Sequence, residues 1–479
     1  MTAMVKLGEH ALVLGGSISG LFAARVLSDF YDTVTVVERD ELSDDPVHRR
    51  GVPQGRHVHA LLAQGARTTR ELFPGVLDDV VAEGAPVWDD GELSRFHICY
   101  GGHLMLRSGK APGTPADYQE MALYQPSRPL LECHIRRRLA AIDNVTILGG
   151  QDVAELTATA DRERITGARV VDRATGAERE LTADLTMDAR GRAAHTPACL
   201  EQLGYGRPVE DRIVMHTTYV SQAMRIPPGA LEEMLVIISP VPGRPTGMFL
   251  FNYENDVSIF TAHGMLGHEP PRDLAGMISY VEEFAPPHLV AALRAGEPVA
   301  PVVQHRLPCS QWRRYDKMRR FPAGLLVCGD AMCSFNPIYG QGMSVAAMDA
   351  VALRESLRRG SADLPRRYFR AAAKSIGLAW GLAAGSDLAF PEVEGHRTRS
   401  MRLTGRYVER ILAACETDAD VHAQFFRVTG LVDPPARLFH PTFVYRVARA
   451  NHRRRQRGSQ PRQEPFAAPE LARRDGMPT

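Results

Sequence analysis

A glycine-rich segment near the start of the chain has the residue types and spacing of a turn that binds phosphate. It reads Gly15-Gly16-Ser17-Ile18-Ser19-Gly20. In a dinucleotide-binding turn of the form G-x-G-x-x-G, the first glycine allows the tight turn, the second lets backbone approach the pyrophosphate, and the third lets helix and strand pack closely. Gly15 and Gly20 retain the first and third tasks. Ser17 replaces the second glycine, where its small side chain hinders the approach little and its hydroxyl can donate to a phosphate.

The segments on either side of this turn predict the βαβ unit that such a turn needs. Residues 11–14 form a short apolar run, residues 19–30 have apolar positions at near-helical spacing, and residues 33–38 are rich in β-branched side chains. A helix start directs unpaired N–H groups and a positive dipole at an anion. Glu38, 18 residues after Gly20, lies where an acidic residue accepts a hydrogen bond from a ribose hydroxyl. We place Arg39 beside it in the same cofactor site.

A second segment, about 300 residues downstream, indicates which dinucleotide the turn serves. Residues 324–331 (GLLVCGDA) predict a buried strand with Asp330 at its carboxyl end. A loop with Pro337 follows, and then a second glycine-rich helix start, Gly340-Gln341-Gly342-Met343. An NAD-binding domain has no need of this second helix start. A flavin does, because its ribityl chain needs a hydrogen-bond acceptor and its ring edge gains negative charge on reduction.

Together these motifs resemble those of the FAD-dependent aromatic hydroxylase superfamily. In that superfamily G-x-G-x-x-G, a central D-x-x-G and a late G-D-A…P-x-x-G-x-G segment hold FAD. The resemblance implies that Asp330 binds the ribityl chain and that Pro337 and residues 340–343 line the isoalloxazine ring. It also implies that Arg128, in the segment S-R-P-L-L-E, meets the FAD.

The central motif and two longer stretches refine this resemblance. The central motif reads Asp188-Ala189-Arg190-Gly191-Arg192 and matches at its aspartate, glycine and final arginine. Arg190 departs from the pattern, because it replaces a small residue. Residues 49–75, with V-P-Q-G-R-H-V-H, and residues 379–397, with a W…D…P pattern, are similar to an actinobacterial branch that contains olefin epoxidases of polyether biosynthesis.

Several side chains in the first of these stretches have residue types that bind metals or phosphates. His57 and His59 are expected on a strand, with no Asp, Glu or Cys cluster to complete a metal site, so we predict none. The pair Arg49-Arg50 and Arg56 fit either cofactor phosphates or a solvated surface. The seven cysteines contain no C-x-x-C pair, which is typical of reduced intracellular thiols.

The expected fold class is α/β: a Rossmann-like FAD-binding domain with an interleaved β-sheet substrate domain and C-terminal helices. Four strand-like segments between residues 213 and 264, separated by turn residues, predict that the second sheet is largely antiparallel. The predicted boundaries are residues 1–80, 125–205 and 315–400 for the FAD-binding domain, 81–124 and 206–314 for the substrate domain, 401–450 for a C-terminal helical region and 451–479 for a disordered tail.

Composition excludes other classes of protein. A formal net charge of +1 and a pI of about 7.7 offer no electrostatic basis for nucleic-acid binding. No apolar run reaches the ~18 residues that span a bilayer, so we predict no integral membrane segment and a cytoplasmic location.

The expected activity is that of an FAD-dependent monooxygenase that takes electrons from NAD(P)H and transfers one oxygen of O₂ through a flavin C4a-hydroperoxide. No second nucleotide turn is present, so NAD(P)H is expected to bind transiently. The strand segments MLVIIS and MFLFNY are apolar, which favours epoxidation or hydroxylation of a hydrophobic polyketide or terpenoid. No acid–base or nucleophile pattern stands out, and we assign no catalytic residue.

Two other functions share the same motifs. One is an FAD-dependent reductase or dehydrogenase of the geranylgeranyl-reductase type, and the other is a flavin-binding redox module without turnover. A flavin halogenase is disfavoured, because Trp88, Trp312 and Trp380 lie in no W-x-W-x-I-P context.

Overall fold

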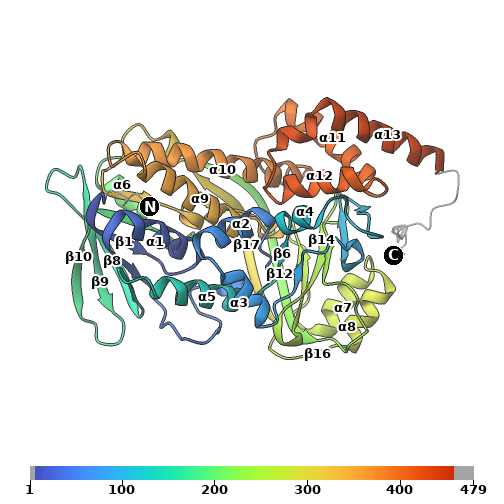
Figure 1. Ribbon diagram of the computed structural model, residues 1–479, viewed down its shortest axis with the longest axis horizontal. Coiled ribbons are helices and arrows are strands. Elements are labelled where there is room, and N and C mark those ends of the chain that lie inside the picture. Colours follow the sequence, from blue (N-terminus) through green and yellow to red (C-terminus); the bar gives the residue numbers. More distant parts are fainter. Residues whose placement is uncertain (1–5, 458–479) are drawn as a thin grey trace, which may run out of the picture.

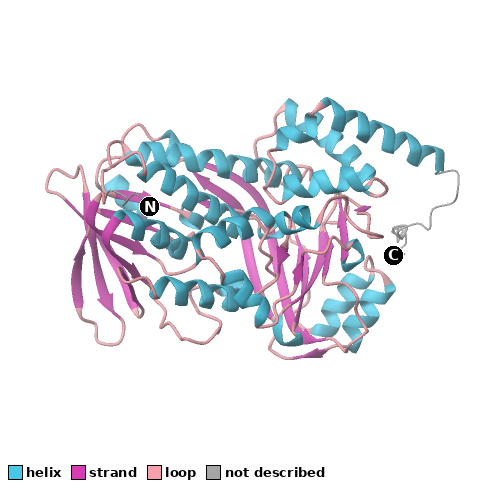
Figure 2. Ribbon diagram, viewed as in Figure 1, coloured by secondary structure: helices cyan, strands magenta, loops and turns pink. Residues whose placement is uncertain are grey.

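The glycine-rich turn follows the first strand of a five-stranded parallel sheet in the computed structural model, which describes residues 6–457 (Figures 1 and 2). Strands of this kind are buried on both faces, and the apolar run predicted at residues 11–14 is fully buried. In sheet order the strands are β18 (Leu325–Val327), β11 (Leu185–Asp188), β1 (Gly8–Leu14), β2 (Tyr31–Val37) and β7 (Val145–Leu148). This sheet confirms the Rossmann-like part of the predicted fold.

One face of this sheet is covered by helices and the other by a small sheet. The helices are α1 (Ile18–Phe30), α5 (Arg128–Ala140) and α9 (Gly342–Leu357), which share one hydrophobic core with the strands. The small antiparallel sheet consists of β8 (Gln151–Ala158), β9 (Ile165–Asp172) and β10 (Glu178–Thr182). Since α9 starts more than 300 residues after α1 in the chain yet packs against it, both glycine-rich helix starts belong to one domain.

A second, larger sheet forms the other half of the molecule (Figure 2). All of its pairs are antiparallel except β13 with β4, which confirms the prediction of a largely antiparallel sheet. Helices α7 (Leu274–Glu282) and α8 (Pro287–Ala295) cover one of its faces. The strands in order are β19 (Cys333–Ser334), β17 (Val303–Arg313), β12 (Glu210–Arg225), β15 (Ser258–Gly264), β14 (Thr246–Asn252), β13 (Leu235–Ile238), β4 (Phe96–Tyr100) and β5 (His103–Leu104), and β16 (Glu297–Pro298) pairs with β12.

Shorter elements connect the two sheets. They are α2 (Ala63–Leu72), α3 (Val76–Ala82), α4 (Pro115–Glu120), α6 (Thr196–Gln202), β3 (Val87–Trp88) and β6 (Leu123–Tyr124). A long helix, α10 (Leu364–Asp387), packs along α9. None of the helices within residues 6–457 combines the length and apolar composition that crossing a bilayer requires.

Three helices near the C-terminus, α11 (Arg399–Cys415), α12 (Ala419–Thr429) and α13 (Pro441–Arg457), lie against the larger sheet (Figure 1). The predicted start of the tail at residue 451 is wrong, because α13 continues to Arg457. Asn451 donates to the Arg410 carbonyl at 2.8 Å and Arg454 pairs with Glu416 at 2.8 Å, so the basic segment is fixed to α11 and its C-terminal end. The remainder of the predicted tail lies outside the described residues.

Candidate functional site

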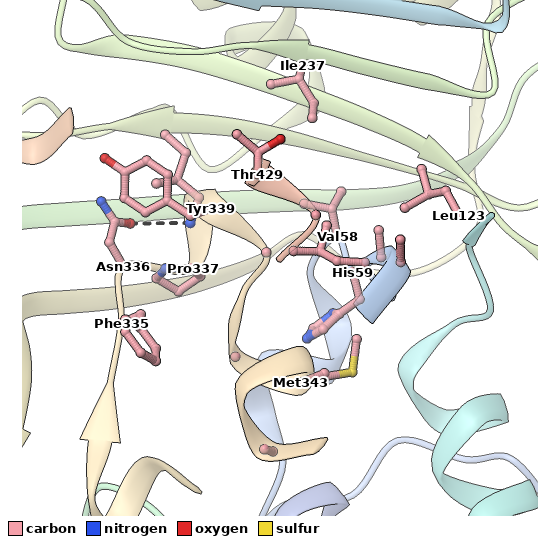
Figure 3. A pocket seen from close by; sticks show the side chains of 18 of the residues that line it. Val58, His59, Leu123, Ile237, Phe335, Asn336, Pro337, Tyr339, Met343 and Thr429 are labelled. Carbon is pink, nitrogen blue, oxygen red and sulfur yellow. Dashed lines mark hydrogen bonds between the residues drawn. The ribbon is translucent and has the colours of Figure 1, made fainter. Parts of the chain in front are cut away.

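A large cavity lies between the carboxyl ends of the parallel strands, the larger sheet and the C-terminal helices (Figure 3). Its volume is about 1660 Å³. Sites for one drug-sized ligand usually measure about 300–1,000 Å³. The cavity therefore has room for more than one small molecule.

Most of the residues predicted to bind the cofactor line this cavity, although they come from four separate stretches of chain. Gly16 and Gly20 do not line it: a Cβ on Gly16 would meet Glu38, and one on Gly20 would meet the Gly15 carbonyl oxygen. Those that line it are Gly15, Ser17, Glu38, Arg39, Arg128, Asp330, Pro337, Gly340, Gly342 and Met343. The fold thus brings the two glycine-rich helix starts to one space.

The first turn requires glycine at the positions that the motif names. Gly15 has a φ of +109°, and a Cβ on it would lie 2.6 Å from the Ala189 carbonyl oxygen. A Cβ on Gly20 would lie 1.8 Å from the Gly15 carbonyl oxygen, so α1 packs directly against the turn. Gly16 donates its N–H to Glu38 Oε2 at 2.7 Å, which ties the turn to the end of β2. Turn and acidic residue are therefore one rigid unit.

Ser17 lies in a buried cluster of charged side chains that the sequence did not indicate. Arg128 Nη2 donates to Ser17 Oγ at 2.8 Å, and that hydroxyl donates to Glu132 Oε2 at 2.9 Å. Arg49 Nε donates to Glu132 Oε1 at 2.8 Å. Burial acts to raise the pKa of Glu132, but the guanidinium groups of Arg128 and Arg49 hold it below its usual range.

This cluster excludes one of the two interpretations left open for Arg49. The residue is buried and also lies 3.3 Å from Glu38, so it is not part of a solvated surface. Arg50 and Arg56 are exposed. The only signal in the sequence for the cluster was the i, i+4 spacing of Arg128 and Glu132, which pairs them on α5 at 3.2 Å.

Asp330 follows β18 in a short 3₁₀ turn (Gly329–Ala331) and faces the cavity. Its carboxyl group is open to the cavity but otherwise surrounded by protein. Burial raises its pKa, and the charges of Arg128 and Arg192 oppose that shift. A partly desolvated acceptor at this position suits hydroxyl donors such as those of a ribityl chain.

The central motif is held together by the arginine that departs from the superfamily pattern. Arg190 turns back onto buried Asp188, with both guanidinium-to-carboxylate distances at 2.9 Å. Burial acts to raise the pKa of Asp188, but the charge and hydrogen bonds of Arg190, together with a hydrogen bond from Thr196, hold it below its usual range. Arg192 instead reaches the larger sheet and donates to the Cys309 carbonyl at 2.7 Å. Arg190 therefore stabilises the motif internally.

The loop after β19, which carries Asn336, Pro337 and Tyr339 (Figure 3), is fixed by a buried hydrogen-bond network. Tyr339 Oη donates to Asp387 Oδ1 at 2.7 Å, and Asn336 Nδ2 donates to the same oxygen at 3.0 Å. Tyr219 Oη donates to Asn336 Oδ1 at 2.5 Å. Burial raises the pKa of Asp387 to about 6. The network joins the loop to α10 and to β12 of the larger sheet.

The second glycine-rich helix start leaves open space where a planar ring is expected. A Cβ on Gly340, whose φ is +63°, or on Gly342 would meet no protein atom within 4 Å. Pro337 and Met343 line the same part of the cavity (Figure 3). Together with the cradle formed by the first turn, these residues fit FAD.

Trp380 supports this loop from outside the cavity. Its ring packs 5.7 Å from that of Trp312 and 6.3 Å from that of Phe335, and it does not line the cavity. Trp380 and Asp387 were predicted to share one side of a helix, and both contact the segment Phe335–Asn336.

His57 and His59 line the cavity in a loop, and the prediction that they lie on a strand is wrong. The chain forms a 3₁₀ turn at Pro53–Arg56 instead, since proline cannot donate to a strand ladder. His57 Nδ1 lies 2.7 Å from Ser221 Oγ. Burial lowers the pKa of His57 to about 3 and that of His59 to about 4, so both are neutral at pH 7.

One cluster of possible metal ligands lies elsewhere in the described residues. Side-chain atoms of His97, Glu233 and His288 lie within 4.8 Å of one another. Arg107 already bonds to His97 Nδ1 at 2.8 Å and to Glu233 Oε1 at 2.7 Å. A guanidinium group therefore neutralises this cluster, and the cluster offers no support for a metal site.

The larger sheet gives the cavity an apolar wall. Because side chains alternate along a strand, Leu235 and Ile237 of β13 face the cavity while Val236 and Ile238 pack on α7 and α8. The cavity-facing apolar side chains of the wall include Phe96, Ile98, Leu235, Ile237, Phe249 and Phe251.

Comparison with a curated protein establishes the family of this chain. It is 37% identical over 439 residues to protein Rv3254 of Mycobacterium tuberculosis, and the match covers 89% of this chain and 90% of that protein. The chain belongs to the family of protein Rv3254. No family model matches it.

Solved structures share the fold at low sequence identity. PqsL from Pseudomonas aeruginosa, a probable FAD-dependent monooxygenase, is similar with a TM-score of 0.54 and 18% identity over 88% of this chain and 99% of PqsL. The flavin-dependent brominase Bmp2 is similar with a TM-score of 0.61 and 13% identity over 94% of this chain and 100% of Bmp2. At these identities the likeness establishes the fold, which this member of the Rv3254 family shares with flavin-dependent monooxygenases.

Proposed function

We propose that the chain is an FAD-dependent monooxygenase that uses NAD(P)H and O₂ to epoxidise or hydroxylate a hydrophobic secondary metabolite, such as a polyketide or terpenoid. One observation carries the proposal. The cradle of the first turn, the open space at the second helix start and the apolar wall border the same cavity. A cofactor bound between the two helix starts would therefore face an apolar substrate space.

The proposed cofactor site assigns a task to each group of residues. The first turn and the N-terminus of α1 would hold the pyrophosphate, with Arg128 beside it. Glu38 would accept from the ribose and Asp330 from the ribityl chain. The N-terminus of α9, from Gly342, would stabilise negative charge at the ring edge. Bound FAD supplies the redox chemistry, taking electrons from NAD(P)H and activating O₂ for transfer of one oxygen atom.

The protein's own contribution is orientation and exclusion of water. The network from Asp387 to Tyr339 and Asn336 holds the loop beside the proposed ring in one conformation. The apolar wall keeps water from the reacting atoms, which protects an activated oxygen from unproductive decay. His57 and His59 are neutral and too weakly basic to act as general bases near neutral pH. This favours a substrate that reacts without deprotonation, as an olefin does.

Two other reactions have the same fold or motifs. A halogenase such as Bmp2 is disfavoured, because none of the four lysines (Lys6, Lys110, Lys317 and Lys374) lines the cavity, and halogenases need a lysine beside the substrate. A reductase of the geranylgeranyl-reductase type would have the same cofactor site and is distinguished by experiment.

The test is turnover in air compared with turnover without oxygen. We expect NADPH oxidation with O₂ uptake, and a product heavier by one oxygen atom when a lipophilic olefin is accepted. Product formation without oxygen, at a stoichiometric cost in NADPH, would instead establish the reductase.

A matched pair of glycine variants tests whether the cofactor occupies the space proposed for it. In Gly342→Trp the indole would fill the open space at the start of α9, so we expect a folded protein without flavin. Gly405→Trp is the control, because a Cβ there also meets no atom within 4 Å but the position is exposed on α11. Equal flavin contents in the two variants would contradict the proposed ring position.

A further inference from the structure

The end of the cavity that is formed by the C-terminal helices differs in charge from the rest. Residues Thr442, Arg446, Arg449 and Arg453 of α13 line it. Their spacing of i, i+4, i+7 and i+11 places them on one stripe of the helix. The neighbouring stripe, with Val447 and Ala450, is buried against the other C-terminal helices. The arginine stripe therefore faces the cavity because of how α13 packs.

Two of these arginines are available for a ligand. Arg446 pairs with Asp420 at 2.7 Å. Arg449 and Arg453 have no side-chain hydrogen bond or ion pair to any residue in 6–457, and both are exposed. Exposed arginines at the open end of a cavity keep their charge and can meet an incoming anion without prior loss of a protein partner.

The acidic residues at this end do not cancel that charge. Asp418 caps the N-terminus of α12, accepting from the N–H groups of residues 420 and 421. Asp117 accepts from the N–H and the hydroxyl of Thr114, the residue that caps α4. Asp420 is paired with Arg446. Arg449 and Arg453 therefore have no carboxylate partner within residues 6–457, and exposed Arg437, which lines the same cavity, adds a third unpaired guanidinium.

The surface next to the arginine stripe is apolar. The cavity residues there include Tyr100, Met121, Ile338, Phe426 and Phe443. A ligand that fills this end and also reaches the proposed flavin would contact apolar side chains along its body and guanidinium groups at its outer end. Those two contacts together define an amphiphile.

We propose that the substrate is an amphiphilic anion, whose apolar body lies in the cavity and whose carboxylate or phosphate group is held by Arg449 and Arg453. The inference rests on the proposed function for what happens to the apolar body, but binding of the anionic end can be measured without turnover. A carboxylate or phosphate accepts two hydrogen bonds from one guanidinium, a geometry that a neutral ester or alcohol does not offer.

Binding is tested by displacement of the neutral dye Nile red from FAD-saturated protein. FAD saturation is needed because Arg39 and Arg128, at the cofactor end, would otherwise attract the same anions. The competitors are tetradecanoate, tetradecyl phosphate, methyl tetradecanoate and tetradecanol. We expect both anions to bind roughly 5- to 20-fold more tightly than the two neutral molecules, with the preference falling at high salt.

The double variant Arg449→Gln/Arg453→Gln should reduce this preference to about twofold or less while leaving affinity for the neutral molecules unchanged. The matched control is Arg402→Gln/Arg406→Gln, an exposed i, i+4 pair on α11 that does not line the cavity. The control should keep the wild-type preference.

Four results would overturn the proposal: no binding of any competitor, equal binding of anions and neutral molecules to the wild type, a preference that survives the double variant, or equal losses in the double variant and the control. A double variant that loses affinity for NADPH but keeps its preference for anions would assign the stripe to the co-substrate and also overturn it. Failure of the proposed function would be a separate result, because it would be measured as a protein that binds no flavin or that consumes no oxygen.

Discussion

Ser17 illustrates how a substitution in a motif can be compatible with its role. Its hydroxyl is already engaged by Arg128 and Glu132, so it is not free to replace a backbone contact with phosphate. Arg128 and Glu132 also pair directly at 3.2 Å. The serine therefore adds one hydrogen bond to a pair that exists without it.

This arrangement makes different predictions for two positions of the turn. Ser17→Gly should change the dissociation constant for FAD by less than about tenfold, because one hydrogen bond contributes roughly 0.5–1.5 kcal/mol. Gly15→Val should abolish FAD binding, since its Cβ would lie 2.6 Å from the Ala189 carbonyl oxygen at a φ of +109°. Flavin fluorescence titration, with circular dichroism to establish folding, measures both. Loss of FAD in Ser17→Gly would instead make the hydroxyl a phosphate ligand.

Asp349, on α9, provides a prediction about pH. Burial raises the pKa of its carboxyl to about 8, while the unfolded chain has a value near ~3.9. At a pH between these two pKa values, the folded protein retains a proton on Asp349 that the unfolded chain has lost. The free energy of unfolding therefore falls as the pH rises. Asp349→Asn removes this contribution. Between about pH 5 and about pH 7 the wild type should lose roughly 1 kcal/mol per pH unit more than the variant.

Urea unfolding of both proteins at the two pH values measures that difference. Asp363→Asn, which changes an exposed carboxylate, is the control and should leave the wild-type slope unchanged. Identical slopes for the wild type and Asp349→Asn would contradict a buried, protonated Asp349.

At the scale of elements, the C-terminal end of α10 holds the loop beside the proposed flavin ring through one carboxyl group. Asp387→Leu would leave the hydroxyl of Tyr339 and the amide of Asn336 without an acceptor, at a cost of roughly 2–5 kcal/mol in the free energy of unfolding. Asp387→Asn retains an acceptor oxygen and should cost less than about 2 kcal/mol.

Thermal or urea unfolding tests this assignment, and a double variant sharpens it. Adding Tyr339→Phe to Asp387→Leu should cost little more than Asp387→Leu alone, because the interaction is already lost. Additive costs would show that the hydrogen bond from Tyr339 does not support the loop.

Elements with a regular spacing of apolar residues were predictable from the sequence, and elements fixed by contacts between distant residues were not. The first strand, helix and second strand lie where the sequence placed them, because apolar spacing sets each one locally. The loop at His57 and His59 was predicted as a strand, since two alternating residues do not distinguish a strand from a loop. The end of α13 was predicted as disordered from its basic composition, which does not show that Asn451 and Arg454 have partners in and next to α11.

The residues of the candidate site divide in the same way: those set by local backbone could be predicted from the sequence, and those set by contacts between distant residues could not. The glycines, Glu38 and Asp330 have motif positions that depend on local backbone, and the fold brings most of them to one cavity. Glu132 and Arg49 form their cluster across 83 positions of sequence, which no spacing rule reveals. The other predicted domain boundaries remain predictions.

In the whole molecule, the proposed function assigns a cofactor part and a substrate part to one cavity, and a variant can separate them. Ile237→Trp would place a large side chain in the substrate part, so we expect normal FAD content, loss of Nile red binding and NADPH oxidation that releases peroxide. Val299→Trp, at an exposed position outside the cavity, is the control. Loss of FAD in Ile237→Trp would show that the two parts are not separate.

In the proposed site, two helix starts about 300 residues apart hold the two ends of one cofactor. Titration of the cofactor-free protein with FAD and with FMN tests this arrangement most directly, because FMN lacks the ADP half that the first turn would bind. We expect stoichiometric binding of FAD and much weaker binding of FMN. Equal affinity for the two flavins, or a protein that takes up neither, would contradict it.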